Sequence, residues 1–239
     1  YGGKGINVST VLKNLGVDSV ALGFVAGFTG KAIEDGVAAL GVKADFITVS
    51  DGVSRINVKL KAGEETEING KGPNISDAEL EELYKKLDGL TDGDCLVLAG
   101  AIPPSLPSDV YEKIMARLAG KKVDIVVDAT KDLLLNVLKY HPFLIKPNNF
   151  ELGEMFGVTL HSDEEIEEYA KRLQALGARN VAISMAGDGS MLLTETGETY
   201  RMGVPKGKVV NSVGAGDSMV AGFIASYFAE HDYKKALKY

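Results

Sequence analysis

The stretch Asn211-Ser212-Val213-Gly214-Ala215-Gly216-Asp217-Ser218 places a turn of small residues directly before an apolar helical pattern, residues 219–228. It follows a β-favouring run at 208–210, so a strand, a tight turn and a helix succeed one another. Backbone N–H groups at a helix start attract anions, and glycines let an anion approach the main chain. The carboxylate of Asp217 would repel a bound phosphate, but it could accept a proton from a hydroxyl that attacks one. The stretch therefore indicates phosphoryl transfer.

The same order of strand and helix recurs along most of the chain. Repeated β-α units predict a mostly parallel sheet with helices on both faces. Serines followed by an acidic residue, Ser76, Ser108 and Ser162, are the expected N-caps of three helices. Apolar periodicity predicts helices at 6–15, 31–40, 77–87, 108–119, 132–138 and 163–176, and strands at 19–24, 46–49, 95–99, 123–127, 143–146 and 180–184.

Two further segments are predicted to be hairpins. Polar and apolar residues alternate at 55–61 and 64–68, and Ala62-Gly63 joins the two segments. The alternation indicates that one face of the hairpin is covered and the other is exposed to solvent. Residues 189–195 and 198–202 form the second hairpin, around Thr196-Gly197.

Composition limits the class of protein. With 239 residues, 45% hydrophobic and 25% charged, the chain suits one large globular domain. A net charge of −7 and an isoelectric point near 5.1 argue against nucleic acid or an anionic membrane as a partner. No run approaches the ~18 apolar residues of a membrane span. Cys95 is the single cysteine, which fits a reduced compartment, and we expect the cytoplasm.

The opening Gly2-Gly3-Lys4-Gly5-Ile6-Asn7-Val8 is a second candidate site. Glycines at a helix start admit a ligand, and Lys4 and Asn7 supply charge and hydrogen bonds; a flexible terminus is the other interpretation. No Gly-Lys pair precedes Ser or Thr, and the third glycine of the dinucleotide fingerprint would fall on Met219. A P-loop enzyme or a Rossmann dehydrogenase is therefore disfavoured.

The glycine cluster and the segment 213–217 together resemble the two signatures of the ribokinase/PfkB carbohydrate kinases. The resemblance extends along the whole chain through the stretches SRINVK (54–59), LAGAIPP (98–104) and IKPNNFE (145–151). It implies a ribokinase-like three-layer α/β sandwich, with a mostly parallel central sheet flanked by helices and a small β lid. Residues 1–51 and 71–239 would form the kinase domain, and residues 52–70 would form part of the lid.

The resemblance also implies transfer of the ATP γ-phosphoryl group to a sugar phosphate. Fructose 1-phosphate, giving fructose 1,6-bisphosphate, is the expected acceptor, and tagatose 6-phosphate is the alternative. A non-catalytic homologue that binds sugar phosphate and nucleotide is the hypothesis from another class. Lys4 and Arg55 disfavour a sugar that carries no phosphate.

The family's catalytic and sugar-binding residues map onto the two glycine-rich segments. Asp217 matches the catalytic base, and the N–H groups of Gly214, Ala215 and Gly216 match the anion hole. The substrate-binding residues implied are Gly3, Lys4, Gly5, Asn7 and Arg55. Of these, the two cations would hold the phosphate already on the sugar, and the amide would bind its hydroxyls.

The resemblance also implies a nucleotide site, formed by residues that follow the predicted strands. Asn148 and Glu151 match an Asn-x-x-Glu motif that would hold Mg²⁺ through water, although an N-cap with an acidic first turn explains the same pattern. The nucleotide-binding residues implied are Lys146, Asn148, Ser184, Gly187, Gly189 and Ser212.

The lid and the chain ends complete the expectations from the family. The lid would cover the sugar and pair with a second subunit in a homodimer. Relative to the family, the chain lacks the opening strand with its sugar-binding aspartate and the last elements of the adenine pocket. Ala101 stands where many relatives place a serine near the substrate phosphate.

Overall fold

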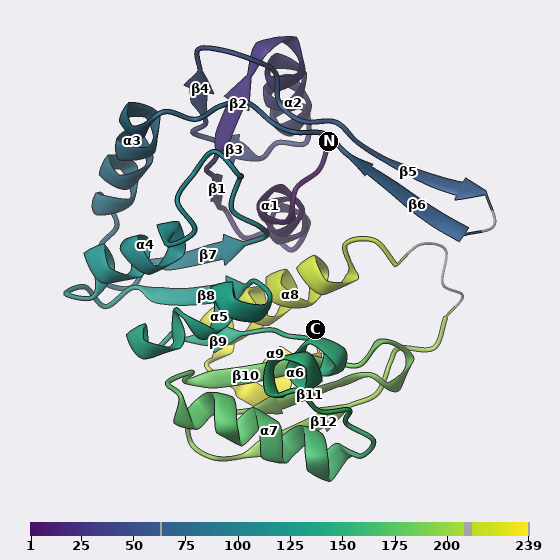
Figure 1. Cartoon of the computed structure of the whole chain (residues 1–239). Coiled ribbons are helices and arrows are strands. Elements are labelled where there is room, and N and C mark those ends of the chain that lie inside the picture. The colour runs from purple at the N-terminus through teal and green to yellow at the C-terminus, as the bar shows by residue number, and fades with distance from the viewer. Residues whose placement is uncertain (63, 208–211, 239) are drawn as a thin grey trace.

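The computed structural model describes residues 1–62, 64–207 and 212–238 (Figure 1). The β-favouring run at 208–210, Asn211 and the hairpin glycine Gly63 lie outside the described residues. Among the described residues, no helix combines the length and the apolar character needed to cross a membrane.

A six-stranded sheet forms the centre of the molecule. Hydrogen bonds join its strands in an order that reverses the sequence, from the last strand to the first. The first four strands are parallel, and the late hairpin adds the last two in antiparallel register. The mostly parallel sheet is thus confirmed. Its strands are β7 (Cys95–Ala99), β8 (Asp124–Asp128), β9 (Leu144–Ile145), β10 (Asn180–Ser184), β11 (Ser190–Leu193) and β12 (Thr199–Met202).

Helices cover both faces of this sheet, as predicted. Alternation along β8 divides the core: Val126 packs with one helical layer, whereas Ile125 and Val127 pack with the other. The first layer contains α1 (Lys4–Asn14), α8 (Ala215–Glu230) and α9 (Tyr233–Lys238). The second contains α3 (Asp77–Asp88), α4 (Val110–Leu118), α5 (Lys131–Leu135), α6 (Asn149–Phe156) and α7 (Asp163–Ala175), with the 3₁₀ turns η1 (Leu138–Tyr140) and η2 (Ala186–Asp188) in the connections.

The N-terminal part of the chain forms two small parallel pairs of strands beside α2 (Gly27–Ala39). β1 (Val20–Ala21) pairs with β3 (Lys43–Ala44), and β2 (Phe24–Ala26) pairs with β4 (Ile47–Val49). The strand predicted at 19–24 is therefore divided at Leu22-Gly23, because glycine weakens a strand interior.

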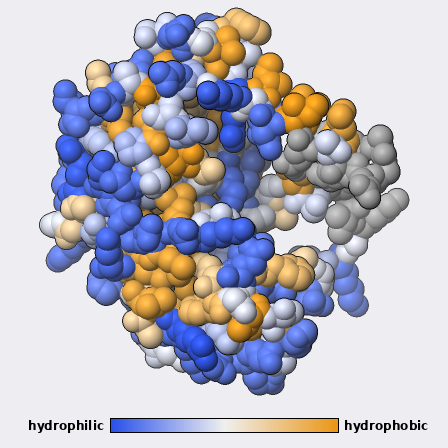
Figure 2. All heavy atoms as spheres, viewed as in Figure 1, coloured by the Kyte–Doolittle hydropathy of each residue, from blue (hydrophilic) through white to orange (hydrophobic). Residues whose placement is uncertain are grey.

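The first predicted hairpin is confirmed as β5 (Asn57–Ala62) and β6 (Glu64–Asn69), paired from Asn57 opposite Asn69. It projects from the body on the side where α8 begins (Figure 1). Among the residues that the structure describes, no element covers the face of the hairpin that was predicted to be covered. Figure 2 shows apolar atoms, in orange, at the surface along the described part of this hairpin. The exposed apolar side chains at its base and along its strands are Ile56, Val58, Leu60 and Ile68.

Two of the three expected N-caps are confirmed. The hydroxyls of Ser76 and Ser162 accept the N–H groups of the third helical residues. The prediction for Ser108 is wrong, because α4 begins two residues later. There the N–H of Val110 donates to Pro107 O, and the turn displaces the helix start.

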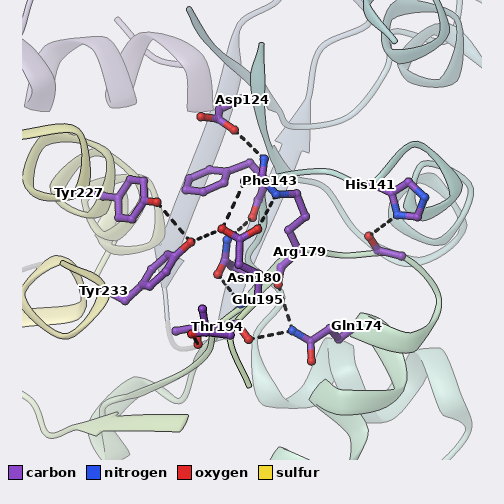
Figure 3. Close-up of polar contacts among 12 residues, drawn as sticks. Asp124, His141, Phe143, Gln174, Arg179, Asn180, Thr194, Glu195, Tyr227 and Tyr233 are labelled. Atoms are coloured by element: carbon purple, nitrogen blue, oxygen red, sulfur yellow. Dashed lines mark hydrogen bonds and ion pairs between the residues drawn. The ribbon is translucent and has the colours of Figure 1, made fainter. Parts of the chain in front are cut away.

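A network of polar side chains fastens the far end of α8 to the sheet (Figure 3). The Arg179 guanidinium donates to Asp124 and Glu195, at 2.7 Å each. Tyr233 of α9 donates to Glu195 at 2.6 Å and accepts from Tyr227 of α8 at 3.3 Å. Because this network fixes the C-terminal end of α8, it also helps to set the position of the opposite end, where Asp217 lies.

Candidate active site

Polar side chains gather at the carboxyl ends of the parallel strands. Asp128 ends β8, Lys146 follows β9, and Ser184 ends β10. In open α/β sheets this edge is where ligands bind. The N-terminal end of α1 lies at the same edge, because Lys4 Nζ is 3.2 Å from Asp128 Oδ1. The start of α8 lies beside it, since the side chain of Asn7 in α1 donates to Asp217 Oδ2 at 2.7 Å.

The turn that opens α8 has the geometry expected for an anion site. Gly214 is the N-cap with φ 82°, a left-handed conformation that favours glycine. Asp217 lies in the first helical turn and is only 6% exposed. One expected donor is engaged in this structure: the N–H of Ala215 donates to Ser212 O at 3.2 Å. Ser212 thus closes the turn through its carbonyl, while its side chain remains exposed.

Asp128 is the site residue that sequence reasoning missed. Its Oδ1 lies 3.2 Å from Lys4 Nζ and 3.3 Å from Lys146 Nζ, and the aspartate is only 3% exposed. Burial and the nearby Asp128 carboxylate raise the pKa of Tyr111 to about 12. The available signal was a carboxylate that ends an apolar run, Ile125-Val126-Val127, at the ligand-binding edge.

The expected nucleotide loop is a compact turn between β10 and β11. A β-bridge pairs Asn148 with Ser184, so these two predicted residues are neighbours. Gly187 is exposed within η2. Gly189 has φ 96°, and a Cβ there would lie 2.1 Å from Met202 O, so backbone packing alone requires a glycine. The prediction that this loop binds nucleotide is not tested by that packing.

Asn148 and Glu151 form a capping box at the start of α6. Asn148 Oδ1 accepts the N–H of Glu151, and Glu151 Oε2 accepts the N–H of Asn148, both at 2.8 Å. The N-cap interpretation of this pattern is therefore correct for the isolated chain. In the part of the chain that the structure describes, no group of three or more His, Cys, Asp or Glu side chains could hold a metal ion.

The remaining sugar-side residues lie on α1 and before the hairpin. Gly3 is the N-cap of α1 with φ 124°, and Gly5 has open space around it in the first turn. Arg55 is exposed and forms no hydrogen bond or ion pair with Lys4, Asn7 or Asp217. The segment that carries Arg55 is anchored nearby, because Ser54 is buried and its hydroxyl accepts the N–H of Ala26.

Comparison with known proteins gives concordant results. The profile of the pfkB family carbohydrate kinases matches residues 1–239. The 1-phosphofructokinase of Bacillus subtilis is 49% identical over 237 residues, covering 99% of this chain and 78% of the relative. The D-tagatose-1-phosphate kinase of Bacillus licheniformis is 40% identical, covering 93% and 73%. A crystal structure from Staphylococcus aureus, assigned as a phosphofructokinase, is 45% identical with a TM-score of 0.88, covering 99% and 76%.

Proposed function

Because this chain belongs to the pfkB family of carbohydrate kinases, we propose that it phosphorylates fructose 1-phosphate with ATP. The products are fructose 1,6-bisphosphate and ADP. The observation that carries this proposal is the buried carboxylate of Asp217 in the first turn of α8, held by Asn7 beside a pair of lysines. The 49% identity to a 1-phosphofructokinase supports the choice of sugar.

The chemistry assigned to this site begins with deprotonation. Asp217 accepts the proton of the free sugar hydroxyl as that oxygen attacks the γ-phosphorus. A new P–O bond forms while the bond from the γ-phosphorus to the bridging oxygen breaks, and ADP leaves with that electron pair. The N–H groups of Gly214, Ala215 and Gly216 stabilise the charge on the transferring group, for which Ala215 must release Ser212 O.

We assign Lys4 and Lys146 to the phosphates of different substrates. Lys146 lies beside the first turn of α8, since a Cβ on Gly216 would come within 3.1 Å of its Nζ, and we assign it to the nucleotide. Lys4 and Arg55 hold the phosphate on the sugar, and Asn7 binds a hydroxyl. Arg55 reaches the sugar when the hairpin closes over the site, which also excludes water.

ATP is the phosphoryl donor in this family, and we propose that Mg²⁺ accompanies it. The described residues fit such an ion. The capping box at the start of α6 uses one carboxylate oxygen of Glu151, and the second oxygen takes no part in it. Asn148 and Glu151 would hold its hydration water, because Mg²⁺ retains several waters and binds few protein groups. When bound, the ion would neutralise charge on the phosphates.

The ATP and sugar-phosphate sites belong to the domain formed by residues 1–51 and 71–239, with residues 52–70 as part of the lid. The exposed apolar side chains of β5 and β6 support a homodimer in which the two lids pair. We place the reaction in the cytoplasm, where the single thiol of Cys95 stays reduced.

Tagatose 1-phosphate is the second candidate acceptor, because a relative named for that substrate is 40% identical. It carries its phosphate on the same carbon as fructose 1-phosphate and differs at one hydroxyl. Tagatose 6-phosphate carries the phosphate at the opposite end of the sugar and would need a reversed binding mode.

A coupled ADP-release assay with the three sugar phosphates tests the proposal. We expect the highest kcat/KM for fructose 1-phosphate, and the variant Asp217→Asn provides the background rate. A higher kcat/KM for either tagatose phosphate would replace the assigned acceptor. ADP release that never exceeds the Asp217→Asn background would favour a non-catalytic binding protein.

A further inference from the structure

A single buried carboxylate oxygen joins the two halves of the site. Asp128 Oδ1 contacts both Lys4 Nζ, at 3.2 Å, and Lys146 Nζ, at 3.3 Å. The two lysines are 142 positions apart in the sequence. One lies on the sugar side of the proposed site and the other on the nucleotide side. Their ammonium groups therefore share one anchor.

Each of the two lysines lies at the N-terminal end of a helix, where a positive charge is destabilising unless an anion is close. Lys4 is the first residue of α1, whose first turn contains no acidic residue. Lys146 is only 6% exposed, and its Nζ lies against the first turn of α8 beside Gly216. The N-terminal end of a helix carries a partial positive charge, which repels a nearby ammonium group. Burial of Lys146 adds a desolvation cost. Asp128 compensates both lysines.

The second oxygen of Asp128 shows that the group is not optimised for the stability of the fold alone. Asp128 Oδ2 is buried and, within the described residues, has no hydrogen-bond partner. A buried acceptor without a donor destabilises a protein, and such groups are rare unless a site requires them. This carboxylate therefore suits a functional site in which charge changes when ligands bind.

We propose that Asp128 is a positioning residue that holds Lys4 and Lys146 on one oxygen and so fixes the two phosphate-binding ammonium groups relative to each other. This inference rests on the proposed function, in which one lysine serves the sugar phosphate and the other serves ATP. Asp128 contacts the lysines and not the reacting atoms. It keeps the ammonium groups together despite their mutual repulsion, and it leaves the cluster with one net positive charge for incoming phosphates.

The test compares Asp128→Asn, which removes the charge but keeps the shape, with Asp128→Glu and with a matched surface control. Asp35→Asn is that control, because Asp35 is exposed and pairs with Lys31 one turn earlier in α2. We expect Asp128→Asn to lower kcat about 10²-fold, as misplaced binding groups do, and to raise KM for both substrates. Asp128→Glu should recover part of the loss, and the control should match the wild type.

Double mutants separate positioning from a structural role. In a Lys4→Met, Lys146→Met background, Asp128→Asn should cost less than threefold, because the groups it positions are gone. An undiminished loss in that background overturns the proposal. So does a lowered melting temperature with unchanged kcat and KM, or a change confined to the Mg²⁺ dependence. If Asp128→Asn does not fold, the kinetics of Lys4→Met, Lys146→Met and the double variant test the proposal instead. The proposal then requires the loss of activity in the double variant to be smaller than the product of the two single losses.

Nucleotide binding distinguishes failure of this inference from failure of the proposed function. Titration with a non-hydrolysable ATP analogue needs no sugar and no turnover. We expect weaker binding to Asp128→Asn than to the wild type and the Asp35→Asn control, even if none of the sugar phosphates is a substrate. Equal affinities for all three proteins would refute the positioning of Lys146.

Discussion

The side-chain amide of Asn7 donates a hydrogen bond to Asp217 Oδ2 across 2.7 Å, although 210 positions separate the two residues. The bond joins the first turns of α1 and α8, the two helices that begin in glycine-rich segments. With Oδ2 engaged, Oδ1 is the oxygen that can face a substrate hydroxyl. Asn7 thus orients the carboxylate to which we assign the proton transfer.

Asp217→Asn should abolish most turnover and leave ligand binding intact. An amide cannot accept the hydroxyl proton, and general bases typically contribute 10²–10⁴-fold to a rate, so we expect kcat to fall by about that factor. The ADP-release assay measures the rate, and titration with fructose 1-phosphate measures binding. A kcat within about threefold of the wild type would show that Asp217 is not the base.

Asn7→Ala should lower kcat and raise KM for the sugar phosphate together. The variant removes the hydrogen bond that orients Asp217 and the expected contact with a sugar hydroxyl; we expect about a tenfold loss in kcat. Steady-state kinetics of Asn7→Ala, Asp217→Asn and the double variant form a cycle. Fully multiplicative losses would mean that the two side chains act independently.

The sequence predicted the two glycine-rich turns of the candidate site, because a backbone conformation that requires glycine leaves a local signal in the sequence. The Gly214 turn, with φ 82°, and the Gly3 cap, with φ 124°, both need a residue without Cβ, and that need is visible in the sequence. Asp128 was missed for the opposite reason. Its role depends on contacts with Lys4 and Lys146, which only the tertiary fold brings together.

The sequence predicted helices and strands well where apolar periodicity is strong. It predicted their ends less well where main-chain hydrogen bonds determine the first helical residue. The apolar runs at β7, β8 and β10 mark their strands within one residue. The helix expected from Ser108 begins only at Val110, because a turn closed by Pro107 O takes its first residues. No local pattern in the sequence distinguishes that turn from a capped helix.

Gly216→Ala tests the contact between α8 and Lys146. A Cβ at this position would lie 3.1 Å from Lys146 Nζ, so the ammonium group must move by a few tenths of an ångström. We expect KM for ATP to rise and kcat to fall about tenfold, with no loss of stability, since alanine favours a helix by about 1 kcal/mol. Gly120→Ala is the control, because its Cβ would meet open space. Equal kinetics for both variants would place Lys146 outside the site.

Replacement of an exposed apolar residue of the hairpin tests the proposed lid dimer. Ile68 is 56% exposed on β6, and Ile68→Glu should turn the dimer into a monomer, because a charge would be buried at the contact. Light scattering coupled to size-exclusion chromatography measures the mass. Leu176→Glu, at a position 52% exposed and outside the hairpin, is the control. A dimer that survives Ile68→Glu would argue for another interface.

Arg179 should make stability depend on pH through Glu195. The Arg179 guanidinium, followed by the Tyr233 hydroxyl, holds the pKa of Glu195 below its ordinary value of 4.5. A lowered carboxylate pKa stabilises the folded state above the unfolded pKa, and that stabilisation is lost as pH falls through the folded value. The free energy of unfolding, measured in urea, should therefore decrease as pH falls below about 5.

Arg179→Gln should weaken that dependence and destabilise the protein at pH 7. The variant leaves Asp124 and Glu195 without their shared cation, which should cost about 1–2 kcal/mol for groups that are partly exposed. Arg172→Gln is the matched control: Arg172 also lies over an aromatic ring and pairs with one carboxylate, but its ion pair with Glu168 is exposed. It should cost less than about 0.5 kcal/mol. The same urea midpoints and acid slopes for both variants would show that the Arg179 network contributes no more than a surface ion pair.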